Sequence, residues 1–149
     1  MIAMFTPANP DYRARVETIF AAAPFIADLG IELHDCGPGW CETSLKLQPQ
    51  HFQQNQVVHA GVQATLADHT AGAAAGTLMS AEQVVLTVEY KVQLLRAAQG
   101  EHLTCRAEVL RPGKQITAVE SVVLAHPAEG AEGKLVAKLS ATMALVTGR

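Results

Sequence analysis

The sequence has few aromatic residues, few charged residues and no run of basic residues. Aromatic residues make up 5% and charged residues 17% of its 149 residues, and the formal net charge is −3. Binding to duplex nucleic acid requires concentrated positive charge, and single-strand binding usually requires aromatic side chains that stack on bases. We therefore expect no nucleic-acid partner. The hydrophobic content of 49% instead predicts one globular domain with a substantial core.

Cysteines are also scarce, and their number is odd: Cys36, Cys41 and Cys105. Cys36 and Cys41 flank the turn Gly37-Pro38-Gly39 and could face one another across a hairpin, although we favour free thiols over a disulfide. The sequence does not open with a charged segment followed by an apolar stretch, as a secretory signal would. A reduced, cytoplasmic protein is expected.

No long apolar run is present either. The nearest candidate is 59–78, which contains Gly72-x-x-x-Gly76, a spacing found where membrane helices pack. Its apolar residues are mostly Ala and are interrupted by polar residues such as Gln63 and Asp68. Because a spanning helix needs about 20 predominantly apolar residues, we predict no membrane association.

Hydrophobic periodicity and turn signals predict the order of elements along the chain. We expect helices or helical turns at 11–22, 26–29 and 59–78, a polar loop at 48–56, and strands at 31–47 (broken at 37–39), 84–95, 103–110, 116–125 and 135–146. This order predicts an α+β fold, an antiparallel meander wrapped around helix 59–78. We expect one domain over 1–149, with 1–25 as a helical extension.

Stretch 84–95 alternates strictly in the sequence. Val88, Tyr90, Val92 and Leu94 are predicted on one face of the strand, and Glu89, Lys91 and Gln93 on the other.

Asp68 lies in the middle of the small-residue helix, with no Lys or Arg within ten residues on either side. A helix that is apolar or small all round is buried, and an unpaired carboxylate there costs free energy unless it has a use. Asp68 is therefore a candidate catalytic residue. The alternative is an acid that is capped or paired inside an ordinary α+β core.

His59 and Asp68 are nine residues apart, which in a helix corresponds to half a turn and a rise of roughly 13 Å. If both residues are helical, they point to opposite sides and cannot meet within one subunit. A two-fold dimer would bring them together, each copy giving one residue to each of two sites.

Ala60 and Gly61 fall near the predicted helix start, where backbone N–H groups have no partner within the helix. Such groups polarise a carbonyl oxygen. A carboxylate facing that carbonyl acts as a general base on water or attacks the acyl carbon directly. Since no G-x-S-x-G motif is present, these parts predict acyl transfer to water through a carboxylate.

Two segments resemble a known family. Residues 58–68 (VHAGVQATLAD) resemble the H-[GA]-G-x-x-x-x-L-x-D signature of the PaaI-like acyl-CoA thioesterases of the hotdog-fold superfamily. Residues 86–101 (LTVEYKVQLLRAAQGE) resemble the strand that follows in this family and its L-R-P-A-x-G-E end. The resemblance covers about 26–146.

The resemblance implies a role for each matching residue. Asp68 matches the catalytic carboxylate, and the Ala60 N–H, with that of Gly61, matches the group that polarises the thioester carbonyl. His59 matches a histidine that lines the site, and Thr87 falls near a Ser or Thr that holds the attacking water. The implied substrate is an acyl-CoA, with coenzyme A as part of the substrate and no separate cofactor. The implied assembly is a homodimer with the site at its interface, and such dimers often pair again into tetramers.

The chain also departs from the family pattern. Ala60 replaces the first Gly after the His, and Ala97 replaces the usual Pro. Loop 53–56 (QQNQ) takes the place of an Asn or Gly, so Gln54 or Asn55 is expected to orient the substrate.

Basic residues that could meet the phosphates of coenzyme A are few. Arg96, Arg106, Arg111 and Lys114 are the candidates, and Arg111 and Lys114 flank a Pro-Gly turn. The alternative is that they are simply solvated.

Three rival interpretations remain. A hotdog-fold hydratase or dehydratase would need a carboxylate near Thr65 or a His four or five residues after Asp68, where this chain has Gly72 and Ala73. A non-catalytic acyl-CoA binder would not need Asp68. A metal site could be drawn from Asp68 and several histidines (His34, His51, His59, His69), but no H-E-x-x-H or paired C-x-x-C spacing is present, and we expect no metal.

Overall fold

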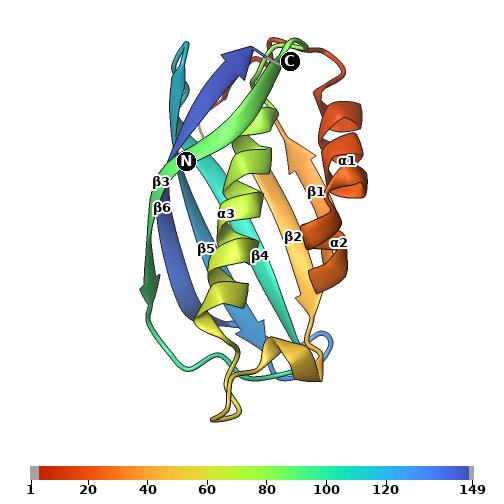
Figure 1. Ribbon diagram of the computed structural model, residues 1–149, viewed down its shortest axis with the longest axis vertical. Coiled ribbons are helices and arrows are strands. Elements are labelled where there is room, and N and C mark those ends of the chain that lie inside the picture. The colour runs from red at the N-terminus through yellow and green to blue at the C-terminus, as the bar shows by residue number, and fades with distance from the viewer. Residues whose placement is uncertain (1–3, 148–149) are drawn as a thin grey trace.

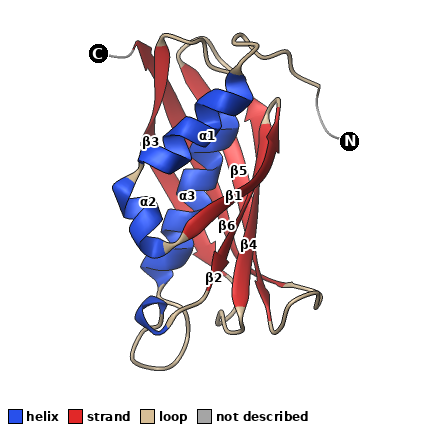
Figure 2. Ribbon diagram, turned by 90° about the vertical axis from the view of Figure 1, so that its right-hand side faces the viewer, coloured by secondary structure: helices blue, strands red, loops and turns tan. Residues whose placement is uncertain are grey.

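A computed structural model describes residues 4–147. Three α-helices pack on one face of a six-stranded antiparallel sheet that curves around the central helix α3 (Figures 1 and 2). The elements are α1 (Tyr12–Ala22), α2 (Pro24–Leu29), β1 (Ile31–Gly37), β2 (Trp40–Lys46), the 3-10 turn η1 (Pro49–His51), α3 (Ala60–Gly76), β3 (Gln83–Leu94), β4 (His102–Arg111), β5 (Ile116–His126) and β6 (Lys134–Thr147). This arrangement confirms the predicted α+β hotdog fold.

The strand order is β1-β2-β4-β5-β6-β3, which corrects the expected simple meander. Strands β4 to β6 do form a meander, but β3 pairs with β6 at the far edge of the sheet and not with β4. After α3 the chain enters β3 at the edge of the sheet beside β6 (Figure 1), and β4 then returns to pair with β2. This order leaves one edge of β3 without a neighbouring strand.

Helix α3 forms the centre of the core because its residues are small. Ala67, Ala71 and Ala74 are fully buried, and side chains of this size let the sheet approach the helix closely. Polar residues at the contact are paired: the Ser121 hydroxyl donates to the Ala67 carbonyl at 3.0 Å, and the Thr43 and Thr70 hydroxyls lie 2.7 Å apart.

The N-terminal helices pack against this core. Val16 on α1 is fully buried, and Arg13 forms an ion pair with Asp35 of β1 at 2.8 Å. Pro24 begins α2, and Gly30, with a φ of 90°, ends it. Both predicted helical segments are thus confirmed, although the helical part runs to Leu29, beyond the residue 25 expected for the extension. No helix within residues 4–147 has the length and apolar character needed to span a membrane.

The β1–β2 hairpin is confirmed, and Cys36 and Cys41 stand opposite one another in it. Both thiols are free and buried, as is that of Cys105. Burial raises the pKa of the Cys36 and Cys41 thiols, and raises that of Cys105 to about 12.

The predicted polar loop 48–56 contains the turn η1, and His51 in it is fully buried. The Gln48 N–H donates to His51 Nδ1 at 2.9 Å, so Nε2 carries the proton and donates to the Leu29 carbonyl at 2.8 Å. His51 therefore ties this loop to the end of α2.

Candidate active site

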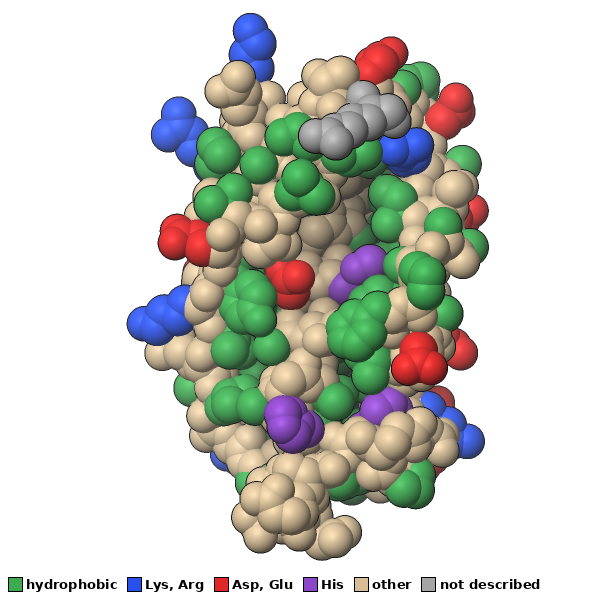
Figure 3. Space-filling model, viewed as in Figure 1, with side chains coloured by type: hydrophobic (Ala, Val, Ile, Leu, Met, Phe, Trp, Pro, Cys, Tyr) green, Lys and Arg blue, Asp and Glu red, His purple; other side chains and the backbone are tan. Residues whose placement is uncertain are grey.

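Asp68 lines a hollow of about 270 Å³ between α1, α3 and β3. Figure 3 shows this face of the molecule hollowed, with apolar side chains along the margins. Most of the lining is apolar, and includes Val16 and Ile19 from α1 and Val85 from β3. The carboxylate predicted from the sequence therefore faces a cavity that could hold an apolar group.

The Asp68 carboxylate has one hydrogen-bond partner among the described residues. The Thr87 hydroxyl on β3 donates to Asp68 Oδ1 at 2.8 Å. Burial raises the pKa of Asp68, and the Thr87 hydrogen bond partly offsets this by stabilising the charged form. Since no Lys, Arg or His forms an ion pair with it within residues 4–147, its charge is available for chemistry.

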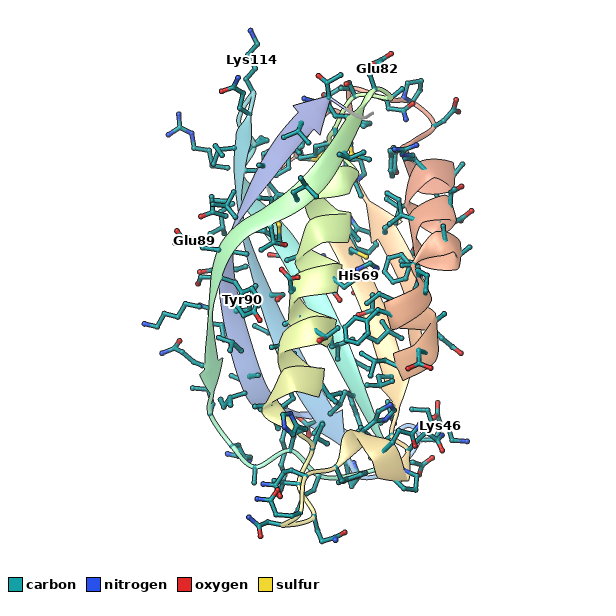
Figure 4. All side chains as sticks on the ribbon, viewed as in Figure 1. Lys46, His69, Glu82, Glu89, Tyr90 and Lys114 are labelled. Carbon is teal, nitrogen blue, oxygen red and sulfur yellow. The ribbon has the colours of Figure 1, made fainter. Side chains whose placement is uncertain are left out.

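A β-bulge at Val88 brings Thr87 to Asp68. In the β3–β6 register Thr87 stands opposite the buried Met143, but Glu89 stands opposite Thr142, so the ladder shifts by one residue between them. Because of this shift, Thr87 and Tyr90 both lie on the α3 side of the sheet, which strict alternation would forbid. Figure 4 shows Tyr90 beside α3 and Glu89 directed away from it. The predicted alternation therefore holds from Glu89 onward but not across Val88.

The start of α3 differs from the expected geometry. His59 is the N-cap residue, with φ −57° and ψ 137°, so it is not helical and the half-turn argument does not apply to its side chain. Its Nδ1 accepts a hydrogen bond from the Gly61 N–H at 2.8 Å. The structure thus assigns the Gly61 N–H to His59 and not to a ligand, whereas the Ala60 N–H has no acceptor within residues 4–147.

Ala60 lines a second hollow, of about 400 Å³, at the N-terminal end of α3, whereas the Asp68 cavity lies along the middle and the C-terminal half of this helix. Gln53, Gln63 and Arg96 line the second hollow as well. Gln63, which sequence analysis did not single out, is buried; its Nε2 donates to the Val58 carbonyl at 3.2 Å, and its Oε1 has no partner among the described residues. A buried amide in a helix of small residues is the signal that could have identified it.

Ala60 and Asp68 are too far apart to act on one carbonyl group within a single protomer. Eight residues of α-helix separate them, which is a rise of about 12 Å. Ala60 and Asp68 therefore belong to two separate hollows on one chain.

The predicted substrate-binding residues are scattered. Gln54 and Asn55 are exposed on the loop before α3, and Gln53 reaches the Ala60 hollow where they do not. Arg111 and Lys114 lie at the β4–β5 turn. This turn is at the opposite end of the protomer from the Ala60 hollow, which Arg96 lines (Figures 1 and 4). One chain therefore does not bring Arg96, Arg111 and Lys114 to the same phosphate group.

Arg106 is engaged within the sheet. Its guanidinium forms ion pairs with Glu42, at 2.5 Å, and Glu108, at 3.0 Å, and lies 4.7 Å from the centre of the Trp40 ring. These contacts account for Arg106 without a ligand. A hollow of about 640 Å³ on the opposite face of the sheet includes Arg106 but none of the residues predicted to be catalytic.

The histidines considered as metal ligands do not converge. His69 packs edge-on against Phe20, with ring centroids 4.5 Å apart, and His51 is bonded to backbone groups. Within residues 4–147, no cluster of three or more His, Cys, Asp or Glu side chains has the arrangement of a metal site.

Comparisons with known proteins agree with this fold. The model of the thioesterase superfamily matches residues 55–127. A putative esterase of Haemophilus influenzae is 30% identical over 92 residues, which are 61% of this chain and 66%, just under two thirds, of that protein.

Solved structures extend the similarity over nearly the whole chain. A thioesterase family protein from Silicibacter pomeroyi is 35% identical, with a TM-score of 0.88 over 92% of this chain and 99% of that one. The PaaI protein from the phenylacetic acid degradation operon of E. coli is 18% identical, with a TM-score of 0.82 over 95% of this chain and 97% of that one, and shares its fold.

Proposed function

The chain belongs to the thioesterase superfamily, and we propose that it hydrolyses acyl-CoA thioesters to a free acid and coenzyme A. Thioester hydrolysis is the activity that its relatives support; the acyl-CoA substrate and the residue roles are our proposal. The observation that carries it is Asp68, a half-buried carboxylate without a cationic partner among the described residues, facing a largely apolar hollow.

Asp68 acts on the thioester by one of two routes: it activates a water molecule, or it attacks the acyl carbon directly. In the first route it takes a proton from a water molecule whose oxygen bonds to the acyl carbon. In the second its own oxygen bonds to that carbon, and water then hydrolyses the resulting anhydride. In both routes the C–S bond breaks and the sulfur leaves as a thiolate, which takes the proton held by Asp68 in the first route and a proton from solvent in the second. Thr87 holds Oδ1, which leaves Oδ2 for either task.

The Ala60 N–H polarises the carbonyl. It lies at the N-terminus of α3, where the helix dipole and the free amide favour developing negative charge on oxygen. His59 supports this by capping the Gly61 N–H and fixing the first turn.

The site forms between two copies of the chain. Since Ala60 and Asp68 are about 12 Å apart along α3, one carbonyl can meet both groups only if they come from different protomers. The free edge of β3 and its exposed apolar side chains supply a surface for the second copy: Leu86 is 57%, Val88 60% and Tyr90 46% exposed. A two-fold axis there gives two equivalent sites.

Thiol release from a panel of acyl-CoAs tests the proposal. Asp68→Asn and Asp68→Ala are expected to lower turnover by roughly 10²–10⁴-fold, whereas Asp28→Asn, a matched change at an exposed position on α2, leaves it unchanged. Binding without turnover in the native protein would contradict hydrolysis. Label on Asp68 after a single turnover in ¹⁸O-water would establish the direct attack with hydrolysis of the anhydride at the Asp68 carbonyl, because the water route puts the label only on the product.

A further inference from the structure

Arg15 on α1 and His69 on α3 line the hollow beside Asp68. Each has one buried nitrogen atom without a hydrogen-bond partner within residues 4–147: Nε of Arg15 and Nε2 of His69. Nearly all buried polar groups in proteins are paired, because an unpaired one costs stability. Two unpaired groups in the lining of one cavity point to a polar partner that is not part of the chain.

Arg15 brings an unneutralised positive charge to this cavity. Arg13, two residues earlier on the same helix, is paired with Asp35 at 2.8 Å, but Arg15 forms no ion pair with any described residue. Asp68 lines the same hollow without pairing with it. The Nε–H of an arginine can only donate, so the missing partner is an acceptor.

His69 is held in place as a neutral ring. Burial lowers the pKa of His69 to about 4, and its ring packs edge-on against Phe20. Figure 4 shows it between α3 and the N-terminal helices. A neutral imidazole nitrogen either donates or accepts, so Nε2 can pair with a carboxylate or a hydroxyl.

The rest of the hollow suits a short or medium acyl chain. Its volume is about 270 Å³, and a water-sized group takes up about 30 Å³. Apart from Asp68, Thr87, Arg15 and His69, its lining is apolar or glycine.

We propose that the acyl group carries an oxygen atom beyond the thioester, in a hydroxyl or carboxylate group, which accepts a hydrogen bond from Arg15 Nε and pairs with His69 Nε2. This inference rests on the proposed thioesterase function and adds the class of acyl group to it. Arg15 and His69 then select the substrate, while Asp68 acts on its carbonyl.

The test compares CoA thioesters of equal chain length, at four and at six carbons. Each series has an unsubstituted acyl group, one with a terminal hydroxyl and one with a terminal carboxylate. We expect kcat/KM for at least one oxygenated member to exceed that of the unsubstituted member by about tenfold to a hundredfold, the effect of one or two hydrogen bonds with a charged partner. The hydroxyl and carboxylate arms identify which oxygen is recognised.

Two variants remove the nitrogen atoms one at a time. Arg15→Met keeps the length of the side chain, and His69→Phe keeps the ring against Phe20. Each should lower the preference for the oxygenated member about tenfold, whereas Arg13→Met, on the same helix but outside the hollow, should leave the preference intact. Since neither nitrogen has a partner among the described residues, Arg15→Met and His69→Phe should leave Tm unchanged. A purely structural role would instead lower Tm.

Three results would overturn the inference. An unsubstituted acyl group processed as well as both oxygenated ones would show that no oxygen is recognised. A preference that survives both variants would show that other residues recognise it. Absence of thiol release from all six thioesters would contradict the proposed function, and this inference with it. If one variant does not fold, the other still tests the pair, because each removes one nitrogen.

Discussion

At the scale of single residues, sequence analysis predicted which residues lie together better than it predicted the hydrogen bonds that they form. Asp68 stood out because a carboxylate among alanines and glycines has no local partner. Thr87 came from the family resemblance, and the structure places its hydroxyl on Asp68. Gln63 and Arg15 were missed, since their burial depends on β3 and α1 packing against α3, which local sequence does not encode.

The Thr87 hydroxyl is expected to set the lower end of the active pH range. Asp68 must be ionised to act, and burial raises its pKa while Thr87 lowers it. Removing the hydroxyl in Thr87→Val therefore raises the pKa of Asp68 further, so activity is lost at a higher pH as the solution is acidified. The acid limb of kcat/KM against pH should move upward.

Thr87→Ser is the matched control, because it keeps a hydroxyl at the same position. Its acid limb should stay near that of the native protein. An unmoved limb in Thr87→Val would mean that this hydrogen bond does not tune Asp68.

Ala60→Pro isolates the proposed electrophile. Proline is favoured at the first position of a helix, where it removes an N–H that has no partner in the helix. His59, with φ −57° and ψ 137°, already has the conformation that precedes proline. We expect a folded protein whose turnover falls by about 10²–10³-fold, the usual effect of losing one such donor. Native turnover in a folded Ala60→Pro would exclude the Ala60 N–H.

At the scale of elements, the helices and strands followed from periodicity, but their arrangement did not. Hydrophobic spacing and the Gly-Pro turns gave every strand to within a few residues. The place of β3 beside β6 and the bulge at Val88 depend on pairing between distant segments, about which alternation within one strand carries no information. The role of His59 as the N-cap residue also did not follow from periodicity, because its conformation is set by the first turn of α3.

Strand β3 is expected to carry the contact between protomers. Tyr90 is 46% exposed in the middle of this edge strand, and a lysine on an exposed edge opposes pairing with another strand. Tyr90→Lys should shift the protein from dimer to monomer in sedimentation experiments and abolish turnover. Leu135→Lys, at an exposed position on β6 (43%), should do neither. A Tyr90→Lys protein that is monomeric and fully active would contradict a shared site.

At the scale of the whole molecule, one chain carries the two groups of the proposed site in separate hollows. The Asp68 hollow lies between α1, α3 and β3, and the Ala60 hollow lies at the start of α3 beside the end of β3. Sequence analysis predicted a two-protomer site from the offset of His59 and Asp68. In the structure the same argument applies to Ala60 and Asp68, because His59 is the N-cap residue and Ala60 carries an N–H without an acceptor among the described residues.

Mixing two inactive variants tests this arrangement most directly. Asp68→Asn and Ala60→Pro are unfolded together, refolded together and assayed for thiol release. In a mixed dimer, one site combines the native Ala60 of one protomer with the native Asp68 of its partner. Random pairing then predicts recovery of about a quarter of native turnover, because half of the dimers are mixed and each has one intact site of two. Turnover that stays at the level of the separate variants, in mixed dimers shown to have formed, would contradict a site built by two protomers.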